Sequence, residues 1–518
     1  MERIVIDPVT RIEGHLKVEV MVEGGVVKEA RTSGTLFRGL EMILQGRHPL
    51  DAPQITQRIC GVCPTAHCLA STLALDEAFG IAGQIPDNGR ILRNLILGAN
   101  LIQSHVLHFY HLALLDYLDL TAVADYEGTD PDLRGLRRFL AEGELGPFLP
   151  RPEGDYRLTK EENRTLALHY VRALDVRRLA HEMSSVFGGK MPHNVGIIPG
   201  GVAAGPTVGA MTSFLWKLND IRQFLADAYV PDVLTVARRY GDHLEQGKGP
   251  GRYLSYGFFP QGPMVGPLAE RQHLFPSGRV SGKGKVADVD PSAITESVAH
   301  SWYAEGTDGS PGDATTAPEP KKPGAYSWLK APRYGGESYE VGPLARLQVA
   351  YARGVEPVRT MTDAVLAELG VGREKLESTM GRLVARALEC QMAAEAMAQW
   401  VLMLRPGEPH AVPFSIPQEA KGVGLTDGPR GALGHWLRIQ GGRIAGYQAV
   451  VPTTWNVGPR DAGDAPGPME QAITGLRVKS AEQPVEVLRV VRSFDPCLAC
   501  AVHLVTVSGR DLGMFRVL

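Results

Sequence analysis

The residues best suited to chemistry are two Cys-x-x-Cys pairs near opposite ends of the 518-residue chain. Cys60 and Cys63 form the first pair, and Cys497 and Cys500 form the second. This spacing lets one turn of backbone direct two thiolates at a common metal ion. Four thiolates select a soft ion such as zinc, iron or nickel over magnesium or calcium, but they do not decide among these ions.

The distance between the pairs bears on the kind of metal site. Roughly 430 residues separate them, whereas structural zinc sites usually close within a much shorter segment. A site closed by both chain ends therefore favours a buried catalytic metal, and a structural zinc site stays open as the alternative. A thioredoxin-like disulfide is less favoured, because neither pair lies in a strand-to-helix unit. Cys68 and Cys390 are interpreted as buried thiols.

Composition indicates a folded enzyme. The chain is 44% apolar and 21% charged, and its 54 basic residues nearly balance 57 acidic ones, so no nucleic-acid partner is expected. The N-terminal MERIVIDPVTRIEGHL has charges and a proline where a secretory signal needs an apolar run, so we expect no export signal there. The uncharged stretch 94–115 contains three histidines and is predicted to be a buried helix, not a membrane span.

Two regions have the pattern of small antiparallel sheets. Near the N-terminus, apolar and polar residues alternate on both sides of turn signals, at Arg3–Ile6, Leu16–Met21 and Val26–Ala30. Near the C-terminus, His435–Ile439 and Arg443–Val451 flank a Gly-Gly turn, which predicts a hairpin.

Between the sheets, helical periodicity dominates and predicts a bundle of long helices at 88–117, 160–187, 209–241 and 373–404. The fold class is therefore α+β, with a long-helix bundle as its core and small sheets in the N-terminal and C-terminal parts. Residues 305–325 are rich in Pro, Gly, Thr and charge, and are predicted to be a surface loop within one domain.

Around the cysteines the sequence resembles the large, catalytic subunits of nickel-iron hydrogenases. Arg58-Ile-Cys60-Gly-Val-Cys63 with His67, and Asp495-Pro-Cys497-x-x-Cys500-x-x-His503, are similar to the two signature motifs of that family. The likeness extends along most of the chain, through the segments 7–16, 37–41, 105–111, 326–333, 429–435 and 447–451.

The resemblance implies unequal roles for the four cysteines. Cys60 and Cys497 would be terminal thiolates on nickel, and Cys63 and Cys500 would bridge nickel to an iron that carries one carbon monoxide and two cyanides. The implied activity is reversible heterolytic cleavage of dihydrogen. Thiolates supply electron density to nickel and strong-field diatomic ligands keep iron low-spin, which fits that chemistry.

Further residues are assigned by the same resemblance. Cys497 or Arg430 would accept the proton, and Glu13 would carry it outwards. Glu41, His503 and the backbone carbonyl of Ala449 would hold a magnesium ion, although an imidazole ligand is less typical of magnesium. Residues expected around the metals are His67, hydrogen-bonded to a bridging sulfur, together with Pro429 and Asp495 near Arg430.

The family likeness also implies processing and partners. Residues 504–518 would be removed after His503 by a maturation protease once nickel-insertion factors have acted, which leaves one catalytic domain, 1–503. Since Cys68 and Cys390 cannot build an iron-sulfur relay, an iron-sulfur small subunit is required. That subunit would carry the export signal to the outer face of a membrane, where a cytochrome b could accept electrons, as in respiratory uptake enzymes.

Other functions stay open at this point. A dihydrogen sensor or a cytoplasmic enzyme linked to NAD or a deazaflavin would share the same cysteine motifs. A quinone-site subunit of respiratory complex I shares the family fold by descent but lacks the cysteine pairs, which this chain has.

Overall fold

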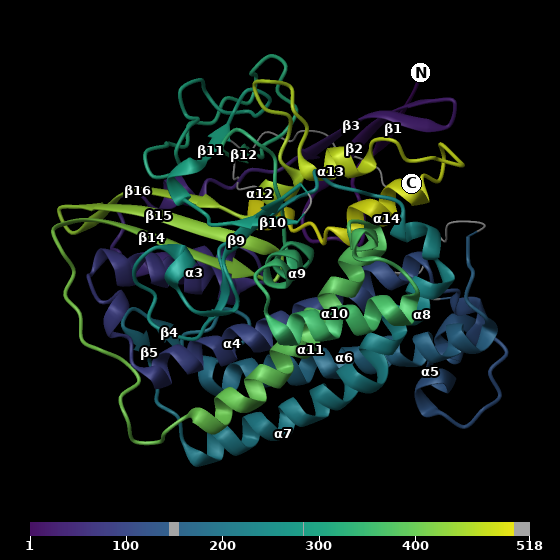
Figure 1. Cartoon of the computed structure of the whole chain (residues 1–518), viewed down its shortest axis with the longest axis horizontal. Coiled ribbons are helices and arrows are strands. Elements are labelled where there is room, and N and C mark those ends of the chain that lie inside the picture. Colours follow the sequence, from purple (N-terminus) through teal and green to yellow (C-terminus); the bar gives the residue numbers. More distant parts are fainter. Residues whose placement is uncertain (144–154, 283, 502–518) are drawn as a thin grey trace.

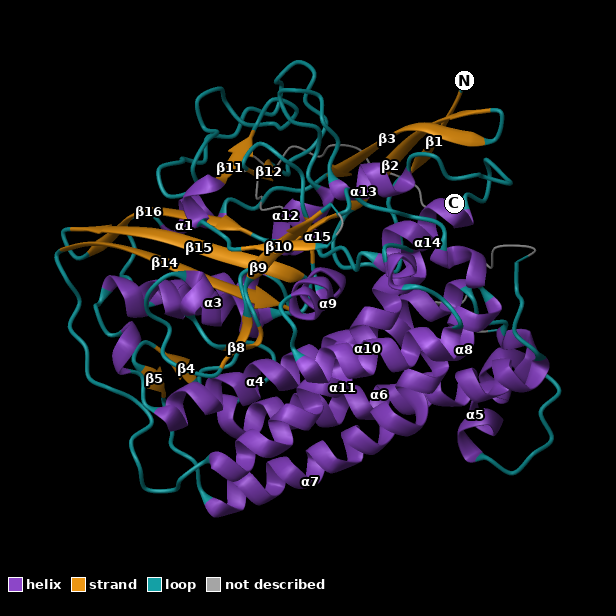
Figure 2. Cartoon of the chain, viewed as in Figure 1, coloured by secondary structure: helices purple, strands orange, loops and turns teal. Residues whose placement is uncertain are grey.

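A bundle of long helices forms one half of the molecule, and small β-sheets lie over it (Figures 1 and 2). The computed structural model describes residues 1–143, 155–282 and 284–501, without the side chains of Cys500 and Ala501. The expected fold class, a helical core with small sheets in the N-terminal and C-terminal parts, is confirmed. His503 and the segment 504–518 lie outside the described residues.

The bundle is built on two helices that are almost completely buried. All residues of α4 (Asp87–Val106) from Ile91 onwards are buried, and so is most of α11 (Thr379–Met403). The helices that pack around these two are α6 (Lys160–Gly188), α7 (Val208–Phe224), α8 (Val230–Arg239), α9 (Pro343–Ala352) and α10 (Glu356–Leu369). A further helix, α5 (Pro131–Ala141), packs against α6. Within the described part of the chain, no helix is long and apolar enough to cross a membrane.

Two of the predicted helices contain wider, π-helical turns that periodicity did not reveal. The helix expected at 88–117 changes to a π-helix at Leu107–Ala113, and the helix expected at 209–241 is interrupted at Leu225–Tyr229. In the second case Pro231 has no N–H, and its ring would clash with the carbonyl of Asp227 in a regular helix. The wider turn accommodates the proline.

The helix predicted at 373–404 also begins later than expected. Residues Arg373–Leu376 form a separate 3-10 turn. Ser378 then caps α11, because its side chain accepts a hydrogen bond from the backbone N–H of Gly381 at 3.0 Å.

Both predicted sheets are present. β1 (Glu2–Ile6), β2 (Leu16–Glu23) and β3 (Val26–Gly34) form an antiparallel sheet in sequence order. The C-terminal hairpin consists of β15 (Gly431–Gln440) and β16 (Arg443–Val450), and it gains a third strand, β14 (Glu419–Gly428), that the sequence did not predict.

The C-terminal sheet lies directly on α3 (Pro64–Ala78), the helix that follows the first cysteine pair (Figure 1). Two glycines of β14 permit this approach. A Cβ atom on Gly424 would lie 1.9 Å from the carbonyl oxygen of Ala70, and one on Gly422 would lie 2.0 Å from that of Ala74. Any larger residue would push the helix away from the sheet.

The middle of the chain contains further short strands that were not predicted. They have two to four residues each, too few for an alternating pattern, and β6 pairs in parallel with β13, far along the sequence. They are β4 (Ile197–Ile198), β5 (Gly201–Val202), β6 (Arg252–Ser255), β7 (Phe258–Pro260), β8 (His273–Phe275), β9 (Gly278–Ser281), β10 (Lys285–Ala287), β11 (Ile294–Ser297), β12 (Ala331–Tyr334) and β13 (Glu340–Val341).

Short helices connect these layers to the chain ends. Before α3 come α1 (Leu40–Leu44) and α2 (Asp51–Thr56), and after the C-terminal sheet come α12 (Pro452–Val457), α13 (Pro468–Ile473), α14 (Val485–Ser493) and α15 (Leu498–Ala501). α13 and α14 pack against the N-terminal sheet and share an apolar cluster with it. The last part of the chain is thereby brought back to the first.

The segment 305–325 contains no named helix or strand. Many of its residues are exposed, but Thr316 and Lys322 are buried. The ammonium group of Lys322 donates to the carbonyl oxygens of Val298 and Tyr303 at 2.8 and 3.1 Å, which ties the segment to the body of the protein. The division into a domain of 1–503 and a removable tail stays a prediction.

A buried carboxyl group on α13 makes stability depend on pH. Burial raises the pKa of Glu470 to about 7, against hydrogen bonds from Thr32 and Tyr326 that lower it. The folded state holds this proton more tightly than the unfolded state. The contribution of Glu470 to the free energy of unfolding is therefore complete below about pH 4.5 and is lost as pH rises towards 7.

Between acidic and neutral pH the wild type should lose up to about 3 kcal/mol of its free energy of unfolding through Glu470, and we expect Glu470→Gln to abolish this loss. The free energy of unfolding, measured by urea denaturation at pH 5 and pH 8, should differ less between the two pH values in this variant than in the wild type. The control is exposed Glu142, whose Gln variant should keep the wild-type difference. An unchanged difference in Glu470→Gln would contradict the assignment.

Candidate metal centre

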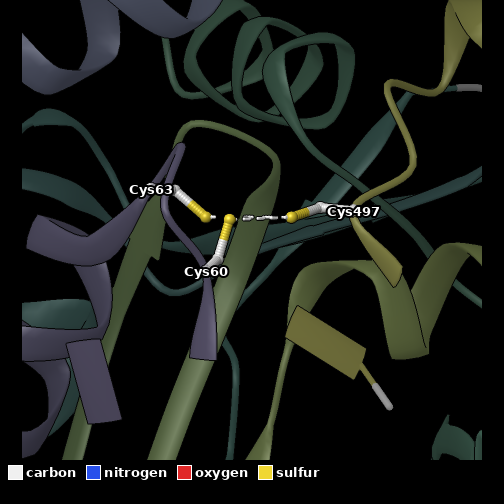
Figure 3. Close-up of side chains that lie close together, drawn as sticks. All are labelled: Cys60, Cys63 and Cys497. Carbon is white, nitrogen blue, oxygen red and sulfur yellow. Dashed lines mark hydrogen bonds between the residues drawn. The ribbon is translucent and has the colours of Figure 1, made fainter. Parts of the chain in front are cut away.

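Three of the four motif cysteines lie together in the interior (Figure 3). The sulfur of Cys497 lies 3.3 Å from that of Cys60 and 4.0 Å from that of Cys63. All three side chains are at most 5% exposed. Cys60 follows a 3-10 turn, Cys63 caps the start of α3, and Cys497 precedes α15, so that both chain ends converge on one point. The Cys500 side chain is outside the described atoms.

The loop that carries Glu13 holds the second cysteine segment in place. The backbone of Glu13 pairs in parallel with Cys497, and its carbonyl oxygen accepts a hydrogen bond from the N–H of Leu498 at 2.8 Å. Gly14 has a φ of +80°, and a Cβ atom there would lie 2.6 Å from the backbone nitrogen of Ala499. A glycine is therefore required at this contact.

Arg38 links the two cysteine segments directly. Its guanidinium donates to the carbonyl oxygen of Ile59, next to Cys60, and to that of Ala499 at 2.5 Å. It also donates to the carbonyl oxygen of Arg58 at 3.1 Å. Sequence reasoning included Arg38 in a family-like segment but gave it no role.

The carboxyl group of Glu13 contacts the predicted proton-accepting thiol. The Cys497 thiol donates to Oε2 of Glu13 at 3.0 Å, and the N–H of Ala499 donates to the same oxygen at 3.0 Å. Burial, together with the nearby Cys60 thiolate, raises the pKa of Glu13 to about 7, although the contact with Cys497 opposes this. The group can therefore gain and lose a proton near neutral pH.

Arg430 is buried beside the three sulfurs, held by Asp495. Its guanidinium donates to the Asp495 carboxylate at 3.0 Å and to the Asp495 carbonyl oxygen at 2.9 Å. Burial alone would lower the pKa of Arg430, but the Asp495 carboxylate and the cysteine thiolates raise it, so the guanidinium stays charged. The structure thus brings Arg430 and Asp495 together beside the cysteines.

The backbone before Arg430 is fixed by Arg346, a residue that sequence reasoning missed. Arg346 is fully buried in α9 and pairs with Glu389 at 2.7 Å and with Asp427 at 2.9 Å. It also donates to the carbonyl oxygens of Gly428 and Pro429, at 3.0 and 3.2 Å. A single arginine within the apolar run PLARLQVA was the available signal, since an isolated charge on a buried helix needs a partner.

The predicted magnesium residues that the structure describes also lie together. The N–H of Ala449 donates to the Glu41 carboxylate at 3.0 Å, and the hydroxyl of Thr316 donates to the same carboxylate. Gln448 in turn donates to the Thr316 hydroxyl at 3.0 Å. Thr316 belongs to the predicted surface loop, so this contact was not foreseen.

His67 lies on α3, one turn after Cys63, and is 1% exposed. Burial lowers its pKa to about 4, so the imidazole is neutral near pH 7. Its Nδ1 lies 3.3 Å from Nε2 of His435 on β15. Cys68 and Cys390 are fully buried, as predicted.

The Arg346 ion pairs predict a large effect of removing one partner. Arg346→Met leaves two buried carboxylates, those of Glu389 and Asp427, without their cation, and should destabilise the protein by about 3–5 kcal/mol. Arg222→Met, which breaks a half-exposed pair with Glu395, should cost about 1 kcal/mol or less. Urea denaturation of the two variants compares them; similar small losses would contradict this account of Arg346.

Comparison with known proteins adds evidence that is independent of this geometry. A family model described as nickel-dependent hydrogenase matches residues 38–503, and a shorter model described as HoxL-like matches residues 3–33. The chain is 41% identical to the periplasmic [NiFeSe] hydrogenase large subunit of Desulfomicrobium baculatum, with 97% of the chain and 95% of that protein covered. It is 37% identical to the uptake hydrogenase large subunit of Rhizobium leguminosarum, with 100% and 97% covered.

Solved structures agree with these relatives. The Ni-Fe-Se hydrogenase of D. vulgaris Hildenborough in the reduced state superposes with a TM-score of 0.86 at 44% identity, over 97% of this chain and 100% of that one. Matches of this extent do not favour a quinone-site subunit or a structural zinc protein. The chain belongs to the nickel-dependent hydrogenase family as a large subunit, and it is thus an oxidoreductase.

Proposed function

We propose that this chain oxidises dihydrogen at a nickel-iron centre held by Cys60, Cys63, Cys497 and Cys500. The observation that carries the proposal is the buried group of three sulfurs, all within 4.8 Å of one another, in a hydrogenase large subunit. Uptake of hydrogen is the favoured direction, because several relatives are named uptake hydrogenases.

The residues present fit the expected metal group. Thiolate donors suit nickel and iron, and the buried position excludes water from the metals. Cys60 and Cys497 would be the terminal nickel ligands, with Cys63 and Cys500 shared between nickel and iron. When bound, the group would supply the heterolytic cleavage of dihydrogen, and its iron would carry carbon monoxide and two cyanides.

The chain's own groups then handle the proton. The Cys497 sulfur receives it and passes it to Oε2 of Glu13, which lies 3.0 Å away. A Glu13 pKa of about 7 allows the carboxyl group to release that proton outwards at neutral pH. Arg430 keeps a fixed positive charge beside the sulfurs, and Asp495 and Pro429 determine where that charge lies.

A magnesium site beside the centre is proposed at Glu41, the backbone carbonyl of Ala449 and His503. The contact between the Glu41 carboxylate and the Ala449 amide supports the first two, because it brings a carboxylate and a main-chain segment together. Oxygen ligands of this kind suit magnesium.

A hydrogenase large subunit works with a small subunit, and we propose that the iron-sulfur clusters reside on that partner. We further propose that nickel-insertion factors and a protease mature the chain, with cleavage after His503. Relatives with periplasmic and quinone-reactive names support a place on the outer face of a membrane, reached together with the small subunit. A membrane cytochrome b would then accept the electrons.

The metal assignment is tested on protein matured with its partner. We expect nickel and iron by elemental analysis, infrared bands of bound carbon monoxide and cyanide, and a chain that ends at His503 by mass spectrometry. Cys500→Ser should lose nickel and these bands, because a hydroxyl is a poor bridge between soft metals. Cys68→Ser, which changes a buried thiol outside the ligand set, should keep both. Absence of nickel from the matured wild type would overturn the proposal.

The proton route is tested at Glu13. Glu13→Gln keeps the size of the side chain but cannot shuttle a proton, so the metals and infrared bands should remain. The enzyme-catalysed exchange between dihydrogen gas and deuterons of heavy water should fall by at least about 100-fold. Exposed Glu23 at the tip of the β2–β3 hairpin is the matched control, and its Gln variant should exchange like the wild type. Exchange at the wild-type rate in Glu13→Gln would exclude this route.

A further inference from the structure

A chain of three buried side chains leads away from the metal centre across the C-terminal sheet. The Nδ1 atom of His67 lies 3.3 Å from Nε2 of His435, and Nδ1 of His435 lies 2.7 Å from the hydroxyl of Tyr447. None of the three is more than 2% exposed. His435 and Tyr447 come from neighbouring strands, β15 and β16, and His67 comes from the helix beneath them.

The number of protons shared by His67, His435 and Tyr447 restricts the tautomers that the two imidazoles can adopt. A neutral imidazole carries one N–H and one bare nitrogen, so each contact in the chain needs one donor and one acceptor. If Tyr447 donates to His435, then His435 must donate from Nε2 to His67, and the His67 proton must lie on Nε2. If His435 donates to Tyr447, every step reverses and Nε2 of His67 is bare.

Both ends of this hydrogen-bonded series, Tyr447 and His67, favour the arrangement in which Tyr447 donates. The Tyr447 hydroxyl lies 2.7 Å from Nδ1 of His435, and a phenol is a stronger hydrogen-bond donor than a neutral imidazole N–H. At the other end, His67 lies one helical turn after Cys63 and feels the charge of the Cys60 thiolate. A thiolate accepts hydrogen bonds and does not donate them, so it favours an N–H on the nitrogen that His435 leaves available.

We propose that His435 and Tyr447 are positioning residues that hold His67 in the Nε2–H tautomer, so that it donates a hydrogen bond to a thiolate of the metal centre. The inference rests on the proposed nickel-iron centre and adds a control of its electronic state. Hydrogen bonds to ligand sulfur withdraw electron density and raise the reduction potential of a metal centre. The Tyr447 hydroxyl thereby influences the reduction potential of the metal centre through the imidazoles of His435 and His67.

The test is Tyr447→Phe, which removes only the hydroxyl and frees the tautomer of His435. In protein matured with its partner, the carbon monoxide and cyanide bands should move to lower wavenumber by more than replicate preparations differ, and the midpoint potential should fall. Tyr253→Phe is the matched control, because Tyr253 is equally buried and its hydroxyl has no hydrogen-bond partner among the described residues. Its bands should stay at the wild-type positions.

Substitutions at His435 separate the tautomer from packing. The amide N–H of Gln can donate to Nδ1 of His67 without help from Tyr447, so His435→Gln should keep bands near the wild-type positions. His435→Leu cannot donate, and its bands should shift as in Tyr447→Phe. In His435→Gln, adding Tyr447→Phe should have no further effect.

The outcomes distinguish the two levels of the argument. If the wild type and Tyr253→Phe show the bands but Tyr447→Phe does not shift them, the proposed control of His67 by His435 and Tyr447 is wrong and the proposed function stands. If Tyr447→Phe fails to mature, the comparison of His435→Gln with His435→Leu decides, and equal bands in these two overturn the proposed control of His67. If the matured wild type has no nickel and no such bands, it is the proposed function that fails.

Discussion

The sulfurs of Cys60 and Cys497 lie 3.3 Å apart although 437 positions separate them in the sequence, and the rest of the structure depends on this contact. Closing so long a segment costs conformational entropy, and burying the polar groups around it costs more unless each finds a partner. The Glu13 backbone and the Arg38 guanidinium supply those partners by hydrogen bonding the Cys497 segment. The bundle and sheets hold these elements rigidly enough for a metal site.

Two buried arginines near the centre are paired with buried carboxylates, one beside the cysteines and one further away. Arg430 is neutralised by Asp495, and behind it Arg346 is neutralised by Glu389 and Asp427. Buried pairs of this kind contribute little net stability compared with apolar packing, but they restrict the backbone to one arrangement. Here that arrangement fixes residues 428–430, so the position of the Arg430 charge depends on contacts well outside the centre.

The sequence predicted those features that depend on local pattern. The N-terminal sheet, the C-terminal hairpin and the long helices followed from periodicity, and the nearness of Cys60, Cys63 and Cys497 followed from motif chemistry. Features that depend on partners distant in sequence were missed. Arg346, the parallel pairing of β6 with β13, and β14, which needs α3 beneath it, have no local signature. Pro231 was visible, but the π-helical turn that accommodates it requires knowledge of the surrounding packing.

The contact between Thr316 and Glu41 gives the segment 305–325 a mixed character. Its composition is that of a connection whose length can vary freely, and Asp308, Ser310 and Gly312 are indeed exposed. Thr316, however, reaches a carboxylate beside the centre. Insertions at the exposed tip between Gly312 and Asp313 should therefore be tolerated. A shift of register at Gly309 would break its backbone pairing with Glu296, and one at Thr316 would displace a group that touches Glu41. For anyone grafting a tag or a surface anchor onto this enzyme, the usable part of the loop ends before this threonine.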